Sequence, residues 1–588
     1  MDNGIFERNI LALSKRDPDL RLKFSGFGTV SGKYKFLKSA SGDIIPALTD
    51  PGGTSRPLHS TVDPKREARR LVESLVGKSP DISGFWVFLG LGAGFAPEAA
   101  LQTAGVSRVI VIEYDITGIV ELFHNCKYDS LLEDPRFTLL ADPSPDLIEK
   151  TVLDMYLPAL HGGIKTLPLR ARTDQDKNRF YAAAEAVQRA VEKVSSDYSV
   201  QAYFGTRWFV NTIHNLRSAW KQKGDVPEIH DAAICAAGPS LDDQIPLLAE
   251  QREKAGSQKL FVISTDTALP ALLSRGFTPD AVVSIDCQHI SYRHFMGTGC
   301  RNIPLFMDIS SPPVLAEFSD FPFFFSGGHP LAAYVSQQWR PLPLLDTSGG
   351  NVTYACLSLA ESLGAQRITV YGADFSYPAG RVYARGTYIY PFFEQKQERR
   401  FPLESRLASF LYRSPFLPAE DAEYSGGENS PRYETAALRL YRENFERKLL
   451  AMEAQVSAAP GRGIPLSIHR KPFSPFSGAG CHAGRIFSLF APGKMLMDAG
   501  QFLEQYRDAI AALPVPGNTN GNTNGTTNGN ANGNSAYLRN LGVDERRVFI
   551  TLLPQMAAIR RRRPELATPG LIEAVKRYSV DEIERVLG

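Results

Sequence analysis

The sequence predicts an α/β protein with several domains, and three observations support this fold class. The chain has 588 residues, more than a single hydrophobic core accommodates. Short apolar runs alternate with helical patterns around residues 85–113 and again across 230–380. In both regions a glycine-containing turn follows the first apolar run. We therefore expect a Rossmann-like N-terminal domain, a central domain with a mostly parallel sheet, and a helical C-terminal region.

Composition excludes some classes of partner. The 65 basic and 63 acidic residues give a net charge of +2, so no overall field favours nucleic acid. No apolar run reaches the ~18 residues that a membrane span needs, and the N-terminus lacks the apolar core of a signal peptide. The six cysteines have no metal-site spacing and fit a reducing compartment. We expect a cytoplasmic protein with no membrane span.

The first domain is predicted to cover residues 1–165. Its first 80 residues are rich in polar and turn residues and suggest short antiparallel strands. A strand over residues 85–89 then leads into a turn with Gly90, Gly92 and Gly94, a helix, and a second strand that ends at Glu113. This pattern resembles the first motif of S-adenosylmethionine-dependent methyltransferases. The alternative is a structural Rossmann-like domain in which the glycines serve only the tight turn.

The remaining boundaries follow from changes in pattern. We expect connecting helices over 166–228, the central α/β domain over 229–400 and a helical C-terminal domain over 401–516. An Asn/Gly/Thr-rich linker at 517–535 is predicted to be disordered, since it cannot form a core. Residues 536–588 should form a small helical appendage on a mobile tether. Within it, the run Arg560–Arg563 fits a solvated helix face.

Polar residues follow nearly every predicted strand of the central domain. Parallel strands place their carboxyl ends at one edge, so these residues should line a common cleft. The alternative is that Asp, Ser and Thr cap the following helices, which would account for about half of them. The residues concerned are Gly238, Pro239, Ser240, Ser264, Thr265, Asp266, Asp286, Asp308, Asp346, Thr347, Ser348, Gly349, Gly350 and Asp374.

Two of these turns have the character of anion sites. Gly238-Pro239-Ser240 places backbone amides and a hydroxyl at a predicted helix start, where the helix dipole favours an anion. The turn from Thr347 to Asn351 repeats the arrangement at another helix start. Two such sites would suit a nucleotide-activated acidic sugar or a pyrophosphate donor. The sequence contains no GxxxxGK[ST], which excludes a P-loop.

Three segments carry a family resemblance: "GPSLDDQIPLL", "VISTDTALPALLSRGFTPDAVVSIDCQ" and "TSGGNVTYACLSLAESLGAQRITVYGADFSY". Together with the helix "FGTRWFVNTIHNL", they resemble the motility-associated factor (Maf) flagellin glycosyltransferases over roughly residues 80 to 500. The resemblance implies a sialyltransferase-like central domain. Such a domain would transfer a nonulosonic acid of pseudaminic or legionaminic type from a CMP-activated donor to serine or threonine of flagellin. The core also resembles archaeal 6-hydroxymethylpterin pyrophosphokinases, which are expected to be much shorter proteins.

The expected reaction needs a base for the acceptor hydroxyl, and a histidine near the cleft would suit this role. His329, which follows a strand and a Gly-Gly pair, is the first candidate, with His289 and His294 as alternatives. Asp286, expected beside Asp266, is the second predicted catalytic residue. Tyr371, Tyr377, Arg381 and Tyr383 would close over the site from the segment around Asp374. The expected donor contacts are Gly238, Pro239, Ser240, Thr265, Asp266, Thr347, Ser348, Gly349 and Asp374.

The expected metal requirement separates the enzyme classes. A sialyltransferase-like enzyme would require no cofactor and no metal beyond its CMP-sugar. A pyrophosphokinase would need Mg²⁺, for which Asp266, Asp286, Asp308 and Asp374 are the candidate ligands. The N-terminal and C-terminal domains would then bind flagellin or its chaperone without taking part in the chemistry.

Overall fold

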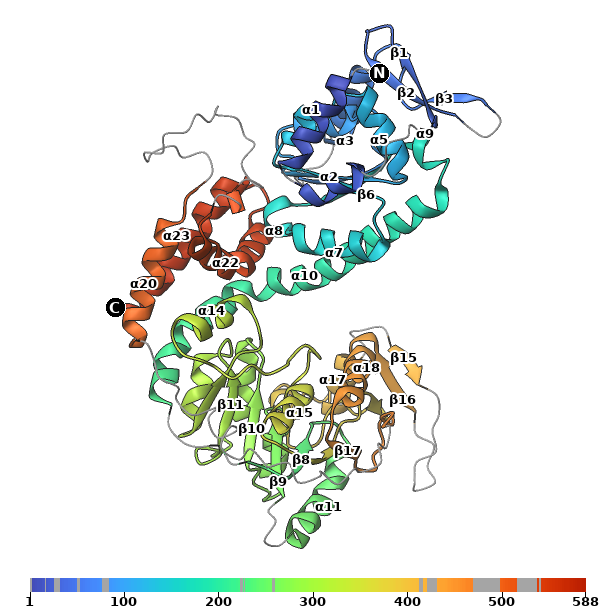
Figure 1. The fold of residues 1–588 in the computed structure, drawn as a ribbon. Coiled ribbons are helices and arrows are strands. Elements are labelled where there is room, and N and C mark those ends of the chain that lie inside the picture. The colour runs from blue at the N-terminus through green and yellow to red at the C-terminus, as the bar shows by residue number, and fades with distance from the viewer. Residues whose placement is uncertain are drawn as a thin grey trace, which may run out of the picture. The chain divides into compact units, whose positions relative to one another are not determined.

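The computed structural model describes residues 3–15, 17–25, 32–49, 53–76, 84–222, 226, 228–255, 260–411, 416–419, 431–468, 497–515, 537–538 and 541–588. The chain divides into two compact units (Figure 1). Unit 1 comprises Met1–Thr206 and Ala509–Val580, and unit 2 comprises Arg207–Asp508 and Asp581–Gly588. The linker predicted at 517–535 lies outside the described residues.

The N-terminal part of unit 1 contains the antiparallel strands predicted from sequence. The sheet has the order β1-β2-β3, formed by β1 (Tyr34–Lys38), β2 (Ile44–Thr49) and β3 (Ser55–Pro57). The same segment contains three helices that were not predicted: α1 (Asn3–Ser14), α2 (Pro18–Ser25) and α3 (Pro64–Val76). Helix α1 contacts α5 and α6, and α3 contacts α4. In α3 only Pro64, Ala68 and Val72 are buried, so a narrow apolar stripe was the only signal.

The predicted Rossmann-like sheet is present in unit 1. Its four strands are parallel in the order β6-β5-β4-β7, so the strand order reverses between β4 and β7. The strands are β4 (Phe85–Leu89), β5 (Arg108–Glu113), β6 (Phe137–Ala141) and β7 (Ile164–Pro168). The connecting helices are α4 (Phe95–Leu101), α5 (Ile116–Asn125), α6 (Asp129–Glu133), α7 (Pro145–Met155), α8 (Pro158–His161) and α9 (Arg170–Thr173).

The helical pattern at 174–220 forms one helix, α10 (Lys177–Lys221), whose residues up to Thr206 belong to unit 1. The C-terminal helices α22 (Val543–Arg562) and α23 (Thr568–Leu587) confirm the predicted helical segment. Its expected mobility is wrong, because α22 packs tightly on α10. A Cβ at Gly205 would lie 1.9 Å from the Pro554 carbonyl oxygen, so only glycine permits this close approach.

Unit 2 is built on a seven-stranded parallel sheet in the order β12-β11-β10-β9-β8-β13-β17. The strand order reverses between β8 and β13. The strands are β8 (Asp231–Cys235), β9 (Phe261–Thr265), β10 (Ala281–Ser284), β11 (Leu305–Asp308), β12 (Pro322–Phe325), β13 (Arg367–Tyr371) and β17 (Gln455–Ala458). Residues 342–345, an apolar run within the alternating pattern, make an isolated parallel bridge between Leu344 and Ser326 and are not one of the sheet's strands.

The boundary predicted at residue 400 does not separate two domains. Strand β17, from the segment expected to be a helical domain, is the edge strand beside β13. A small antiparallel sheet lies in the same segment, formed by β14 (Tyr377–Pro378), β16 (Arg432–Thr435) and β15 (Phe416–Ala419). The short strands follow no long apolar run, which explains why the sequence pattern was interpreted as helical.

Helices and short 3-10 turns complete unit 2. Apolar side chains on the two sides of the sheet form separate core clusters, one with α15 and α18 and one with α11 and α12. The helices are α11 (Leu241–Lys254), α12 (Leu269–Leu273), α13 (Tyr292–Phe295), α14 (Pro330–Gln338), α15 (Val352–Ser362), α16 (Ile389–Glu394), α17 (Leu403–Leu411), α18 (Ala436–Ala451) and α20 (Ala499–Ala512), and the 3-10 turns are His289–Ser291 and Pro313–Phe318. Helix α20 continues from unit 2 into unit 1. Across the described part of the chain, no helix is both long and apolar enough to cross a membrane.

Candidate functional site

The carboxyl ends of the unit 2 strands meet at one edge, as predicted, and their polar side chains form three clusters. The switch cluster lies where the strand order reverses and contains Ser240, Gln244, Asp374, Arg462 and Gly463. The acid–tyrosine cluster contains Asp266, Ser284, Asp286, His294 and Tyr388. The histidine cluster contains Trp208, Asp308, Gly327, His329 and Thr347.

The switch cluster shows what the Gly238-Pro239-Ser240 turn holds. The amide and hydroxyl of Ser240 both donate to the carboxylate of Asp374, the amide at 2.8 Å. The amide of Gly463 donates to the same carboxylate at 3.0 Å. The turn therefore binds an anion, but that anion is the protein's own side chain. The expected open phosphate site at Ser240 is corrected to a closed turn, since Ser240 and Asp374 are only 2% and 4% exposed.

A loop from a distant part of the sequence completes this closure. The amide of Arg462 donates to the Ser240 hydroxyl at 2.6 Å, and the side-chain amide of Gln244 donates to the Pro460 carbonyl at 2.8 Å. A Cβ at Gly238 would lie 2.3 Å from the Gly372 carbonyl oxygen, so glycine is required where β8 and β13 end together. Sequence reasoning missed Arg462 and Gly463, because "PGRGIP" signals only a turn.

The acid–tyrosine cluster brings together the ends of β9 and β10. The Ser284 hydroxyl donates to Asp266 at 2.8 Å, and the Gln288 amide donates to Asp286 at 2.9 Å. Burial, together with the charge of Asp266, raises the pKa of Asp286 above its ordinary value, although hydrogen bonds from Gln288 oppose this. Asp286 is thus a carboxylate that accepts a proton more readily than a free aspartate does.

His294 and Tyr388 form the other side of this cluster. Their rings meet edge to face with centroids 4.6 Å apart. Burial raises the pKa of Tyr388, and the nearby charges of Asp266 and Asp286 add to this effect. His289, the other alternative base, is exposed and stacks on Tyr292.

The segment after Asp374 covers part of the edge, as expected, but only some of the predicted residues do so. Tyr383 lies near enough to Asp266 for that charge to add to the burial that raises its pKa. Tyr371 is instead fully buried within β13, with its hydroxyl on Gln251. Tyr377 pairs with Tyr433 between β14 and β16. Arg381 lines a separate cavity of about 970 Å³ beside α16 and α17.

The histidine cluster holds His329 against α10. The Trp208 ring stacks on the imidazole at 5.9 Å between centroids, and Nε2 lies 3.9 Å from Asp308. The Ala332 amide donates to Nδ1 at 3.3 Å, which leaves the proton of the neutral ring on Nε2. Burial lowers the pKa of His329, while Asp308 opposes this shift. His329 is therefore arranged as a hydrogen-bond donor, which does not support its predicted role as a general base.

Nε2 of His329 is buried and has no hydrogen-bond partner among the described residues. Thr347 lies close by, since a Cβ at Gly327 would be 2.4 Å from Asp308 Oδ2 and 2.9 Å from Thr347 Oγ1. A donor on a buried ring beside a half-buried hydroxyl can bind an oxyanion from outside the chain.

Several other predicted residues serve local structure, as the capping alternative proposed. The Thr265 hydroxyl accepts from the Ala268 amide, and Asn351 caps α15 by accepting from Tyr354. The Ser348 hydroxyl donates to Asp346 at 2.6 Å. Gly349 is needed because a Cβ there would lie 2.1 Å from the Tyr354 ring.

Helix α10 fixes the loops around the clusters through two asparagines that sequence reasoning did not single out. Asn211 donates to the carbonyls of Cys287 and Ser310, at 3.1 and 2.7 Å. Asn215 donates to the carbonyls of Ile309 and Ser311, both at 2.8 Å. Two amides four residues apart within an otherwise apolar helix face were the available signal.

The four aspartates suggested as Mg²⁺ ligands do not converge. Asp308 and Asp374 follow β11 and β13, which are four strands apart, or roughly 19 Å at the usual strand spacing. Within the described ranges, no group of three or more His, Cys, Asp or Glu side chains has a metal-binding arrangement.

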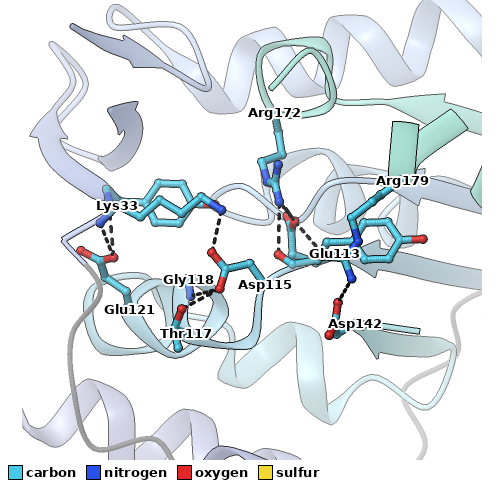
Figure 2. A network of polar contacts seen from close by, with 11 residues as sticks. Lys33, Glu113, Asp115, Thr117, Gly118, Glu121, Asp142, Arg172 and Arg179 are labelled. Carbon is cyan, nitrogen blue, oxygen red and sulfur yellow. Dashed lines mark hydrogen bonds and ion pairs between the residues drawn. The ribbon is translucent and has the colours of Figure 1, made fainter. Parts of the chain in front are cut away.

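The glycine turn of unit 1 is occupied by protein groups. Arg172 donates to Glu113 at 2.9 Å (Figure 2). The amide of Leu91 donates to the same carboxylate at 2.8 Å. The Ala93 amide donates to His59 at 2.9 Å. The groups expected to hold a methyltransferase cofactor are thus already paired, which favours the structural interpretation of this turn.

One protein family and two uncharacterized proteins are similar to parts of this chain. Residues 209–380 match the family described as 6-hydroxymethylpterin diphosphokinase MptE-like. An uncharacterized protein of Treponema pallidum (strain Nichols) is 40% identical over 124 residues, covering 21% of this chain and 42% of that protein. A second one is 31% identical over 144 residues, covering 24% and 66%. The matches thus span less than two thirds of these relatives' own lengths.

A solved structure matches over the entire chain. The Maf glycosyltransferase from Magnetospirillum magneticum AMB-1 aligns with a TM-score of 0.55 at 12% identity, covering 100% of this chain and 95% of that one. The resemblance inferred from the sequence is therefore confirmed at the level of the fold.

Proposed function

We propose that this protein is a glycosyltransferase that moves a nonulosonic acid from a CMP-activated donor to a serine or threonine hydroxyl of flagellin. The observation that carries the proposal is the likeness in fold, over the whole chain, to a Maf glycosyltransferase. The polar strand ends of unit 2 add the chemistry, because fold alone does not determine function. The proposal includes a cytoplasmic location and no requirement for a metal.

The donor would lie along the carboxyl edge of the sheet, which is the usual ligand position in open α/β sheets. We assign its phosphate to the histidine cluster, where His329 Nε2–H is a donor. The Thr347 hydroxyl, which donates to the Gly327 carbonyl at 3.4 Å in this structure, would turn to the phosphate. Ser240 and Asp374 would shape another part of the same edge, where β8 and β13 end. Direct contact between Ser240 and the donor would require the Arg462 amide to release the hydroxyl.

Asp286 would be the general base. It would take the proton from the acceptor hydroxyl while the bond between the sugar anomeric carbon and the phosphate oxygen breaks. The acceptor oxygen forms the new bond to that carbon, and CMP leaves with the electron pair. The raised pKa of Asp286 suits this role, and hydrogen bonds at the leaving phosphate stabilise the charge that develops there.

Ligand-dependent thermal stability tests the donor class. CMP at about 100 times its Kd should stabilise unit 2 by about 2.7 kcal/mol, and the effect should survive EDTA. Incubation with a CMP-nonulosonic acid and flagellin should then release CMP and increase the mass of flagellin by one sugar. The absence of both responses in a folded protein would refute the proposal.

A diphosphokinase acting on a pterin is the second candidate, favoured by the family match of residues 209–380. It predicts stabilisation by ATP only when Mg²⁺ is present and formation of AMP when a hydroxymethylpterin is added. The same thermal panel therefore distinguishes the two functions, because EDTA abolishes one response and leaves the other. A response to S-adenosylmethionine alone would support neither function.

A further inference from the structure

Unit 1 contains a cavity of about 600 Å³ that is lined by none of the residues of the candidate functional site. It lies between α10, the turn that follows α7, and the C-terminal end of α22, all of which belong to the same unit. A volume of this size falls within the range of cavities that hold small organic molecules, which is about 300–1,000 Å³.

Helix α10 presents one face to this cavity. Ser195, Tyr198, Ser199 and Ala202 follow each other at intervals of three, one and three residues, which places them on one side of the helix. The Tyr198 hydroxyl makes no hydrogen bond to another described residue, and burial raises its pKa against the opposing charge of Arg560. Tyr198 is therefore a protonated donor at neutral pH.

Arg560 and Arg561 supply positive charge to the wall, whose lining contains no Asp or Glu. The Arg560 guanidinium donates to the Ala159 carbonyl at 2.9 Å, and burial lowers its pKa. Within the described part of the chain it forms no ion pair with a carboxylate. A half-buried guanidinium without a counter-ion is costly in free energy, and an anionic ligand would offset that cost.

The arginines that follow Arg560 make different contacts from one another, although they are identical in the sequence. Arg563 pairs with Glu565 at 3.1 Å, and Arg562 donates to the Thr206 hydroxyl at 3.4 Å. Arg561 instead lies over the Tyr203 ring at 5.1 Å and borders the cavity. The interpretation of Arg560–Arg563 as a solvated helix face therefore fails for Arg560, which is half-buried, and holds for Arg561, Arg562 and Arg563, which are exposed.

We propose that this cavity is a binding site for a small organic phosphate, held by Arg560 and Arg561 and by the hydroxyls of Tyr198 and Ser195. Two guanidinium groups match the charge of a phosphate dianion, and the hydroxyls donate to its oxygens. The apolar parts of Tyr156, Pro158 and Ala202 leave room for a sugar or a base. The site is independent of the edge of the sheet in unit 2.

The test is a calorimetric titration of the full-length protein with ribose 5-phosphate and with glucuronate, a carboxylate of similar size. Ribose 5-phosphate is also the sugar-phosphate part of CMP, so the comparison of arginine variants, which lie in unit 1, distinguishes this cavity from a nucleotide site in unit 2. We expect saturable binding of ribose 5-phosphate that weakens at least tenfold in R560Q/R561Q and stays unchanged in R563Q. A titration with CMP then shows whether the phosphate of a nucleotide uses the same site.

A second variant tests the cavity independently, in case the double mutant does not fold. Ser199 is exposed on α10 and bonds only within its own helix, so Ser199→Trp should fill the cavity without breaking a contact elsewhere. This variant should also lose binding, while its circular dichroism stays that of the wild type. Absence of saturable binding in the wild type, or equal binding in Ser199→Trp, would overturn the site. Equal affinity for glucuronate would overturn its assignment to phosphate.

Discussion

The two parallel sheets of this protein close their first glycine turn in the same way and differ in what lies beyond it. In unit 1 the Leu91 amide donates to Glu113, and in unit 2 the Ser240 amide donates to Asp374. In both, an acidic residue at the end of a neighbouring strand takes the place that an anionic ligand would occupy. In both sheets, the hydrogen bond between the glycine turn and the acidic residue therefore links the ends of two neighbouring strands.

The difference lies in the remaining strand ends. In unit 1, Arg172 and His59 fill the space around the turn, and Glu113 and Arg172 are at most 1% exposed. Arg172 Nη1 lacks a hydrogen-bond partner among the described residues, but it is closed off from any ligand. In unit 2, Asp286 is a carboxyl of raised pKa that is only half-buried, and the histidine cluster adds an imidazole nitrogen with no hydrogen-bond partner in the described part of the chain. Polar groups that a ligand can reach indicate a site better than the glycine turn does.

The largest expected effect comes from Asp286→Asn, which keeps the shape and the Gln288 hydrogen bond but removes the base. The transfer rate should fall by about 100- to 10,000-fold, the usual contribution of general base catalysis. Because the folded-state pKa of Asp286 is raised, ionisation destabilises the fold at neutral pH, so the variant should unfold at the same or a higher temperature. In the wild type the rate should rise with pH through that raised pKa.

An unchanged rate with Asp286→Asn would place the chemistry elsewhere on the edge. His230→Gln serves as the control, because His230 is exposed and precedes β8 at the opposite end of the strand.

The second effect concerns the closed turn of unit 1. Glu113→Leu leaves Arg172 buried without its partner and should lower the free energy of unfolding by about 3–5 kcal/mol. Transfer per folded molecule should stay close to that of the wild type. Urea unfolding followed by circular dichroism measures the loss. Glu149→Gln, which breaks surface pairs with Arg189 and Lys193, should lower the free energy of unfolding far less, because exposed ion pairs contribute little. Equal effects of both changes would contradict the structural role of Glu113.

The third effect is a pH dependence of unit 1 alone. Burial lowers the pKa of His59 to about 4, so the unfolded state binds its proton first as the pH falls. The contribution of His59 is complete above the ordinary histidine pKa and is lost between about pH 6.5 and 4, amounting to about 1–3 kcal/mol. The unfolding free energy of His59→Gln should depend less steeply on pH in this window than that of the wild type. Identical slopes would show that His59 is not the group responsible.

The smallest effect is expected from Trp208→Leu, which removes the ring stacked on His329. The imidazole would keep its Ala332 hydrogen bond but lose the aromatic ring that fixes its orientation. The transfer rate should therefore fall by about three- to tenfold with little change in KM. Trp220→Leu, at an exposed position on the same helix, is the matched control. A similar loss in both variants would indicate a general effect on α10.

The sequence predicted those parts of the fold that depend on local pattern. Apolar runs and the turn residues after them predicted most strands of both sheets, and the strand ends of unit 2 meet at one edge as expected. Contacts between distant segments were not predictable. The sequence predicts Asp374 and Ser240 to be ligand contacts, because no sequence pattern around either residue indicates that their side chains form a hydrogen bond with each other. Strand β17 was missed for a similar reason, since only its pairing with β13 defines it.

Within the candidate site, residue types were predicted better than their roles. His329 does lie at the edge of the sheet, but its protonation is determined by the Ala332 amide, which no sequence pattern reveals. Trp208 and Asn211 belong to a helix that was expected only to connect and support the domains.

The division of the chain also affects how the protein is made. Unit 1 consists of Met1–Thr206 and Ala509–Val580, with nearly all of unit 2 encoded between these segments. At a synthesis rate of about 5–20 residues per second, α22 leaves the ribosome roughly 20–80 s after the parallel sheet of its own unit. During that interval Gly205 and the neighbouring surface of α10 lack their partner helix. The incomplete unit must therefore remain soluble while the second sheet is translated and folds.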